Sequence, residues 1–283
     1  MRIKRNYYYL VAGLPELLLD EGKMKTSLHD LKIEFQHNVH PDDFELVKYM
    51  FLKYDNSNLL NLLKKNSFEF DERGDFSQEV LEEQIKEQDG TLPQYMNQFI
   101  TSFKDEQRED AETSWEIILE DFFYQYLASI NNEFLRDWFT FQLNTKNVIS
   151  ALVCRQYELK MENQLIGDSD INSNLLRSNA RDFGLGQEFP EIDKVFSAWE
   201  TESLLKREKA LDVINWQWID EHTFFHYFTI ERVIGFLLQF DMVERWMGLD
   251  REEGEKLFNQ LLDQLGRSYE LPDEFKLQSI SRK

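Results

Sequence analysis

Turn-forming residues and cysteine are both scarce in this chain of 283 residues. It has 11 glycines and 5 prolines, and so few turn residues predict long helices joined by short loops, not many short strands. The single cysteine, Cys154, excludes an internal disulfide framework and a zinc site built from cysteines. Because Cys154 lies in an apolar stretch, we expect a buried small hydrophobic side chain, as is usual for a lone thiol in a cytosolic protein.

Long uninterrupted apolar stretches are missing as well. No run of about 18 apolar residues occurs, so the sequence predicts no membrane-spanning helix. A basic start followed by the apolar stretch 7–19 superficially resembles a signal peptide, but Pro15 and Glu16 interrupt that stretch and no small-x-small cleavage site follows. Hydrophobic residues still make up 42% of the chain and aromatic residues 14%, which is enough for a substantial core. We therefore expect a folded, cytoplasmic protein.

Basic residues are outnumbered by acidic ones, 32 to 53, which gives a net charge of −21. Nucleic-acid phosphates and anionic lipid head groups repel such a chain, so no nucleic-acid partner is expected. The charge is concentrated in residues 69–121, where 17 acidic residues face 4 basic ones, a net charge of −13. Two interpretations remain open: a solvated helical surface, or a docking face for a basic partner.

One helical phrase occurs twice in the sequence. Residues 51–65 and 140–154 can be aligned on Asn58 and Asn147. Each copy has a hydrophobic run, a short polar break, an asparagine, and then an apolar helix ending near a basic residue. Such a duplication predicts a fold assembled from similar helical units.

Within these units the sequence suggests structural roles for four residues. The polar break at residues 55–57 places Asn58, and by alignment Asn147, where a helix would begin. Their side-chain amides are therefore expected to cap backbone N–H groups. Lys64 and Arg155, near the ends of the two copies, are expected to stabilise the repeat helices. None of the four is predicted to be a functional site.

The remaining apolar patterns predict helices and no convincing strand. Residues 7–19 fit a strand or a helix, and residues 167–187 are the most loop-like part of the chain. Thr26 is the expected first cap, Pro41 opens the second helix, and Asp250 is expected to cap a separate last helix. The expected helices cover residues 26–37, 41–52, 76–88, 91–106, 110–130, 132–144, 190–199, 206–246 and 251–265.

Histidine spacing offers two weak metal signals. His222 and His226 are four residues apart, a spacing that can bind zinc, but the His-Glu-x-x-His order is absent. Glu34 and His37 match the Glu-x-x-His pattern of carboxylate di-metal bundles, which need a second copy on another helix. No second copy occurs. A structural role is therefore expected for the histidines, and no metal site.

Catalytic motifs are absent from the sequence. Gly184-Leu185-Gly186 lacks a third glycine and a Walker lysine, so it is interpreted as a loop. No Gly-x-Ser-x-Gly occurs, Cys154 has no triad context, and nothing marks one pair of carboxylates as acid and base. We predict no catalytic residue, no cofactor and no small-molecule substrate.

Charges interrupt the apolar segment near the end of the chain. Asp241 and Arg245 are spaced i,i+4 on a predicted helix, so we expect a local ion pair between them. The alternative is that these charges belong to an interface with a partner protein.

Four short motifs resemble the stalk-cap protein of V/A-type ATPases, which is the C-type subunit, or d-type in eukaryotic enzymes. Residues 54–64 read Tyr-Asp-x-x-Asn-Leu-x-x-Leu-Leu-Lys and resemble the repeated element of that family. Residues 144–152 read Asn-x-x-Asn-Val-x-x-Ala-Leu and resemble its second copy, with Asn144 replacing the acid. Ser-Leu-His-Asp-Leu-Lys at 27–32 resembles a segment near the family's start. Residues 230–245, with Glu231-Arg232 and Val243-Glu244-Arg245, resemble its final helix.

The whole chain is similar to an uncharacterised bacterial family encoded beside V-type ATPase genes. Three segments carry this similarity: Tyr-Tyr-Tyr-Leu-Val-Ala-Gly-Leu-Pro at 7–15, Leu-Arg-x-x-Ala-Arg-Asp-Phe-Gly-Leu at 176–185, and Trp-x-Trp-Ile-Asp-Glu-x-Thr-Phe-Phe at 216–225.

These resemblances imply an all-α protein of three helical bundles, divided here into residues 1–108, 109–196 and 197–283. They imply a non-catalytic subunit of a rotary motor for ion transport. This subunit would couple the central rotor stalk to the membrane ring. It would be cytoplasmic and peripheral to the membrane through protein contacts. The expected partners are rotor-stalk and membrane-ring subunits. Two rivals are a helical adaptor or scaffold that docks through its acidic face, and a helical enzyme with a cryptic polar pocket.

Overall fold

The computed structural model describes residues 4–19, 24, 26–105 and 113–268, with side chains up to Leu249. Every regular element within these ranges is an α-helix, so the all-α prediction is confirmed. The helices are α1 (Tyr8–Gly13), α2 (Leu28–Asn38), α3 (Pro41–Lys48), α4 (Leu52–Lys64), α5 (Gln78–Lys86), α6 (Gln94–Lys104), α7 (Trp115–Leu127), α8 (Glu133–Tyr157), α9 (Asp170–Arg177), α10 (Ile192–Trp199), α11 (Leu204–Thr223) and α12 (Ile230–Ser268).

Most helices begin at a side-chain cap that the sequence provides. Ser27, one residue after the predicted Thr26, caps α2, and its hydroxyl accepts a hydrogen bond from the Asp30 N–H in a capping box. Pro41 opens α3 as predicted, after His40 as the cap. Serine or asparagine also caps α5, α7, α8, α9 and α11.

The repeated phrase does not contain the helix start that the sequence suggested. Residues 55–57 lie inside α4, which runs without a break from Leu52 to Lys64. The second copy lies inside α8, a helix of 25 residues that also takes in the separate helix expected at 132–144. A single short helix, α9, occupies part of the segment expected to be loop-like. Polar residues in the two phrases therefore serve contacts inside the fold, not helix ends.

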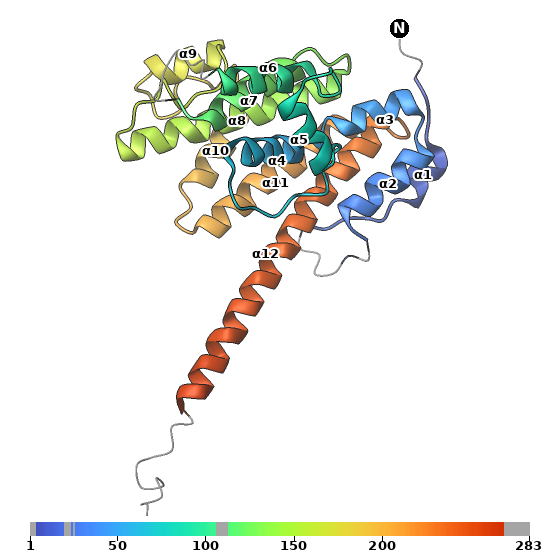
Figure 1. Ribbon diagram of the computed structural model, residues 1–283. Helices are drawn as coiled ribbons and strands as arrows, with labels where there is room; N and C mark the ends of the chain where they lie inside the picture. The colour runs from blue at the N-terminus through green and yellow to red at the C-terminus, as the bar shows by residue number, and fades with distance from the viewer. Residues whose placement is uncertain (1–3, 20–23, 25, 106–112, 269–283) are drawn as a thin grey trace, which may run out of the picture.

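Helix α12 is the last helix of the chain and extends out of the body (Figure 1). Its first part packs on α2 and α11, and the remainder projects beyond the other helices. With 39 residues, it is about 58 Å long at the usual rise per residue. The prediction of a separate last helix at 251–265 is wrong, because α12 continues through this segment without a break. The proposed cap, Asp250, lies outside the described side chains.

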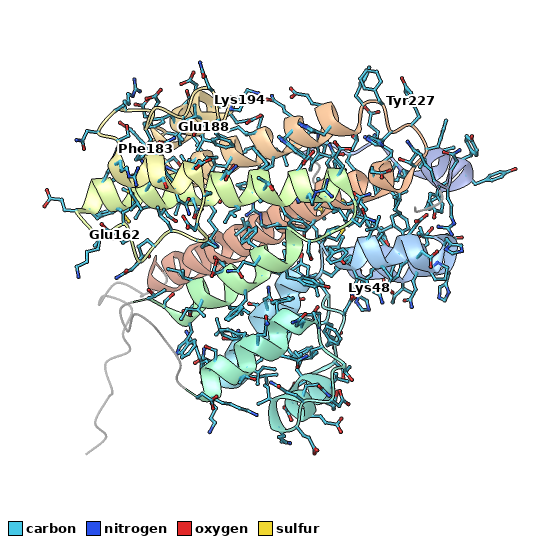
Figure 2. All side chains as sticks on the ribbon, turned by 90° about the horizontal axis from the view of Figure 1, so that it is seen from above. Lys48, Glu162, Phe183, Glu188, Lys194 and Tyr227 are labelled. Atoms are coloured by element: carbon cyan, nitrogen blue, oxygen red, sulfur yellow. The ribbon has the colours of Figure 1, made fainter. Side chains whose placement is uncertain are left out.

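Close packing of α11 against α12 depends on one glycine. A Cβ atom added at Gly235 would lie 2.8 Å from Cγ2 of Thr223 and 3.1 Å from Cγ2 of Ile219, which is too close for an unstrained contact. Nearby residues of α12 such as Val233, Ile234 and Leu237 are fully buried. Figure 2 shows the length of the body, with Phe183 near the end of α8 and Tyr227 at the other end beside α1.

Candidate functional site

Asn58 and Asn147 make the same contact in the two copies of the phrase. Each lies in the middle of a helix and is buried. The Asn58 amide donates to the carbonyl of Asp71 at 2.9 Å, and its oxygen accepts from the Asp71 N–H at 3.0 Å. Asn147 makes the equivalent pair with Ile166, at 2.9 Å in both directions. We call these two contacts the asparagine clamps.

The clamps correct the prediction that Asn58 and Asn147 cap helices. Each amide binds both backbone groups of one residue in the following loop, which satisfies a buried N–H and a buried C=O at once. Each helix is followed by a residue with φ of 54°, Lys65 after α4 and Glu158 after α8. In both copies the loop leads to a short helix capped by serine, α5 or α9. The two phrases thus fold into similar units.

The second clamp has an additional partner, Asn172 of α9. Its side-chain oxygen accepts from the Asn147 amide at 2.9 Å, and its own amide donates to the carbonyls of Ile166 and Gly167. Asn147, Ile166 and Asn172 are all buried. Sequence reasoning missed Asn172, although a polar residue between the apolar residues Ile171 and Leu175 of a short helix could have indicated a buried partner.

In the first unit, Asp55 holds the loop in a second place. Its carboxylate is fully buried and accepts from the N–H groups of Asp75, at 2.9 and 3.0 Å, and Phe76, at 3.1 Å. A Cβ atom at Gly74 would lie 2.3 Å from an Asp55 oxygen, so only glycine fits there. From the other side, Lys32 pairs with Asp75 and donates to the carbonyl of Gly74.

Burial raises the pKa of Asp55 to about 6, although hydrogen bonds from the N–H groups of Asp75 and Phe76 act in the opposite direction. At pH values between the unfolded pKa of about 4 and this native value, Asp55 binds a proton in the native protein but not in the unfolded chain. The contribution of Asp55 to stability is therefore fully present below about pH 4 and decreases as the pH rises through 6. The full decrease is about 3 kcal/mol, of which about 1 kcal/mol falls between pH 5 and 7.

Urea unfolding of the wild-type chain and of Asp55→Asn at pH 5, 6 and 7 measures this dependence. We expect the free energy of unfolding of the wild type to fall relative to that of the variant by about 1 kcal/mol from pH 5 to 7. A difference that is constant over this range would show that Asp55 is ionised throughout.

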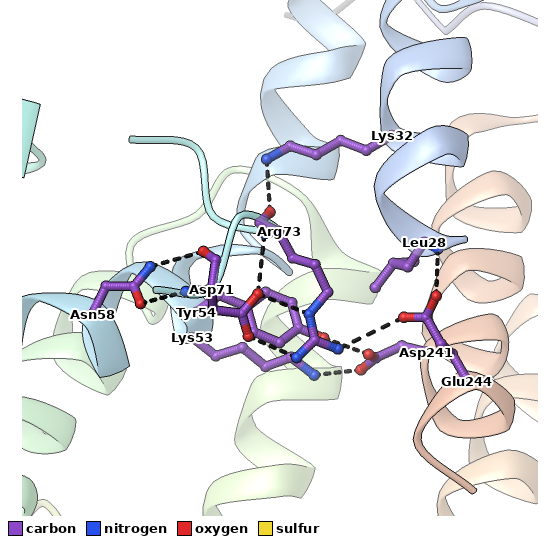
Figure 3. Close-up of polar contacts among 9 residues, drawn as sticks. All are labelled: Leu28, Lys32, Lys53, Tyr54, Asn58, Asp71, Arg73, Asp241 and Glu244. Atoms are coloured by element: carbon purple, nitrogen blue, oxygen red, sulfur yellow. Dashed lines mark hydrogen bonds and ion pairs between the residues drawn. The ribbon is translucent and has the colours of Figure 1, made fainter. Parts of the chain in front are cut away.

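A group of charged and polar residues connects the first unit to α12 (Figure 3). We call it the polar junction, and its members are Lys53, Tyr54, Asp71, Arg73, Asp241 and Glu244. Its centre is Arg73, whose Nε and Nη2 bind the Asp71 carboxylate at 2.9 and 2.6 Å. The same guanidinium lies 4.1 Å from the centre of the Tyr54 ring. Two parallel bonds and a stacked ring give this arginine one defined position.

Helix α12 contributes two carboxylates to the polar junction. Asp241 accepts hydrogen bonds from the Tyr54 hydroxyl and the Lys53 ammonium. Glu244 accepts from the backbone N–H of Leu28 at 2.8 Å, in the first turn of α2, and lies 3.6 Å from Arg73. Burial alone would raise the pKa of Asp241, but the Lys53 charge and the bonds from Lys53 and Tyr54 hold it below its usual value. Asp241 is therefore an anion at neutral pH.

The predicted local ion pair between Asp241 and Arg245 is wrong. Asp241 pairs with α4, whereas Arg245 forms an ion pair with Asp212 of α11. The Asp212 carboxylate also accepts from the Trp246 indole at 2.7 Å. Both charged residues therefore pair with residues of neighbouring helices and not with each other. The charges of α12 thus fasten it to α4 on one side and to α11 on the other.

The two basic residues at the repeat ends also contact neighbouring segments. Lys64 forms an ion pair with Glu116 of α7. Arg155 donates to the carbonyls of Ser178 and Ala180, and its guanidinium lies 3.5 Å from the centre of the Phe183 ring. These contacts stabilise the ends of the repeat helices, although the two residues do so in different ways.

The weak metal signals have structural explanations. His222 lies in the last turn of α11, where Nδ1 is 2.8 Å from the Trp218 carbonyl, and His226 lies beyond the helix end near Thr229. Among the described residues, no group of three or more His, Cys, Asp or Glu side chains is placed to hold a metal ion. Cys154 is buried as expected, and burial raises the pKa of its thiol.

The described surface has open clefts of about 560, 600 and 620 Å³. Their size suits a small molecule, but Asp55, the carboxyl with the raised pKa, lines none of these three. Gly184 has a φ of 74° and its N–H donates to the Asp182 carboxylate in a turn, which fits the loop interpretation of Gly184-Leu185-Gly186.

One family model matches residues 4–275, nearly the whole chain. The family is described as "Protein of unknown function (DUF2764)". No curated protein and no solved structure matches the chain.

Proposed function

We propose that the chain, which belongs to the DUF2764 family, is a non-catalytic subunit of a V/A-type rotary ATPase. In this role it couples the central rotor stalk to the membrane ring, as the C-type stalk-cap protein does. The observation that carries the proposal is the pair of asparagine clamps. Asn58 and Asn147 belong to the two phrases that resemble the repeated element of the stalk-cap family, and they make equivalent contacts.

The proposed arrangement is three helical bundles over residues 1–108, 109–196 and 197–283. This division stays a prediction. The clamps support a repeated unit in the first two segments, since each fixes a loop against a long helix. In the third segment, α12 is held by ion pairs and hydrogen bonds to α4 and α11. A part that transmits torque must resist deformation, and buried, directional contacts of this kind provide such resistance.

The proposed location is the cytoplasmic face of the membrane, with attachment through protein contacts. No helix in the described part of the chain combines the length and apolar character that crossing a bilayer requires. The net charge of −21 favours basic protein surfaces and disfavours anionic lipid. The proposed partners are the rotor-stalk and membrane-ring subunits.

Affinity purification of the tagged full chain from its native cells, in mild detergent, tests the proposal. We expect mass spectrometry to find rotor-stalk and membrane-ring subunits in fixed proportion to the chain. An untagged strain is the matched control for subunits that bind the resin. Recovery of the chain without any ATPase subunit would contradict the proposal.

A second candidate is a helical adaptor that docks through its acidic face. Helix α5 favours it, because Glu79, Glu82 and Glu83 form no ion pair with any described residue. Other carboxylates of the acidic segment are paired, such as Glu116 with Lys64 and Glu120 with Lys146. Residues 106–112 of this segment lie outside the described structure. Recovery of other basic proteins in place of ATPase subunits would favour the adaptor.

A further inference from the structure

Six aromatic side chains are exposed together where α1 meets the connection between α11 and α12. Tyr227 marks this end of the molecule in Figure 2, beside α1. The exposed fractions range from 38% for Phe228 to 98% for Tyr9. We call this set the aromatic surface, and its members are Tyr8, Tyr9, Phe224, Phe225, Tyr227 and Phe228.

The aromatic surface combines two segments that are far apart in the sequence. The Tyr7 N–H donates to the Phe228 carbonyl at 2.7 Å, and the ring centres of Tyr8 and Phe228 are 4.7 Å apart. Phe224 and Phe225 contact each other edge to face at 4.9 Å. Exposed rings gathered in this way indicate an interaction site, whereas single exposed rings do not.

Contacts to α3 hold the backbone segment that carries Tyr8 and Tyr9. The Tyr7 hydroxyl donates to the Asp43 carboxylate, and Arg5 pairs with Asp43 at 3.3 Å and Asp42 at 3.1 Å. These contacts attach the start of α1 to α3. Tyr8 and Tyr9 are therefore displayed on a fixed base, which lowers the ordering cost of binding a partner.

The aromatic surface continues into an apolar groove. A cleft of about 620 Å³ begins at Tyr8 and Tyr9 and is bounded by α1, α2 and α12. Among the described residues that line it, Glu34 alone is charged, and it forms no ion pair with any residue that the structure describes. Three uncharged polar residues, Asn6, Thr26 and Asn38, also line the cleft. Its apolar lining includes Leu10, Leu14, Leu31, Phe35, Phe236 and Phe240.

We propose that the aromatic surface and the groove form a docking site for an apolar helical segment of a partner protein that carries basic residues. An apolar helix face fits a groove with aliphatic and aromatic walls, and exposed tyrosine and phenylalanine rings supply anchoring contacts. A basic side chain on that helix complements Glu34 and the net charge of −21. The same charges oppose an anionic lipid surface. This proposal holds for any partner with this chemistry, inside or outside a rotary ATPase.

Fluorescence anisotropy with a labelled synthetic peptide tests the docking site. The probe is an amphipathic helix of leucine and lysine, and its control is a scrambled peptide of the same composition. We expect the full chain to bind the amphipathic probe at least tenfold more tightly than the scrambled one. Tyr9→Ser combined with Phe225→Ser should weaken this binding at least tenfold. Tyr157→Ser, at another exposed tyrosine outside the aromatic surface, should leave it unchanged.

Four results would overturn the proposal. Equal binding of both peptides, or equal binding by the double variant, would show attraction by net charge alone. Binding of the wild type to phosphatidylcholine vesicles, lost in the double variant, would indicate a lipid surface. Self-association of the wild type in sedimentation, lost in the double variant, would indicate a second copy of the chain. Circular dichroism spectra of the double variant and of the single variant Tyr9→Ser, compared with that of the wild type, check that the fold is retained.

Discussion

Replacing Asn147 by alanine is expected to lower the free energy of unfolding by about 3–5 kcal/mol. The substitution leaves the Ile166 N–H and the side-chain oxygen of Asn172 without their partner, whereas the Ile166 carbonyl keeps its bond from the Asn172 amide. Each buried, unsatisfied group costs about 1–3 kcal/mol, and a cavity adds to this cost. We expect a smaller loss of about 2–4 kcal/mol for Asn58→Ala, because the two groups of Asp71 that lose their partner are only partly buried.

Urea unfolding followed by circular dichroism measures both losses. Asn144→Ala is the matched control, since it makes the same substitution one turn earlier on α8, at a position that is only partly buried. That variant should lose less than about 1 kcal/mol. Equal losses for Asn144→Ala and Asn147→Ala would mean that the clamp contributes nothing specific.

Removing the Asp241 carboxylate is expected to have an effect of similar size. Asp241→Ala leaves the buried Tyr54 hydroxyl and the Lys53 ammonium without their acceptor. Breaking a largely buried, hydrogen-bonded charge group costs about 3–5 kcal/mol. Because Asp241 joins α12 to α4, hydrogen exchange in the first half of α12 should also become faster.

The matched control is Lys53→Ala, which removes the other member of the same ion pair. The Lys53 side chain is 50% exposed, whereas that of Asp241 is 15% exposed. Truncating an exposed member of an ion pair costs about 1 kcal/mol or less, so the two variants should differ by several fold in their loss of stability. A loss as large for Lys53→Ala as for Asp241→Ala would show that the ion pair, not the buried anion, dominates.

The helical class and the repeated phrase could be predicted from the sequence because both depend on local patterns. Scarce glycine and proline and the helical spacing of apolar residues are visible within one turn or two. The role of Asn58 and Asn147 could not be predicted in the same way. Their partners lie 13 and 19 residues further along the chain, and an asparagine in a polar break has a ready local explanation as a cap.

The charges of α12 show the same limit. Spacing alone suggested that Asp241 and Arg245 pair with each other, but their partners are more than 30 residues away, on α4 and α11. The polar junction also depends on Asp71 and Arg73, in a segment where the acidic composition suggested only a solvated or docking surface. The spacing of Asp71 and Arg73, two positions apart, does not indicate that this pair would lie beside α12.

The stoichiometry of the purified complex tests the coupling role most directly. A protein that joins a single central stalk to a membrane ring must be present once for each stalk. We predict that quantitative mass spectrometry of a rotary ATPase, purified through a tag on a rotor-stalk subunit, will find one copy of this chain per stalk. Its absence from the intact enzyme, or a level far below that of the stalk subunits, would contradict the account.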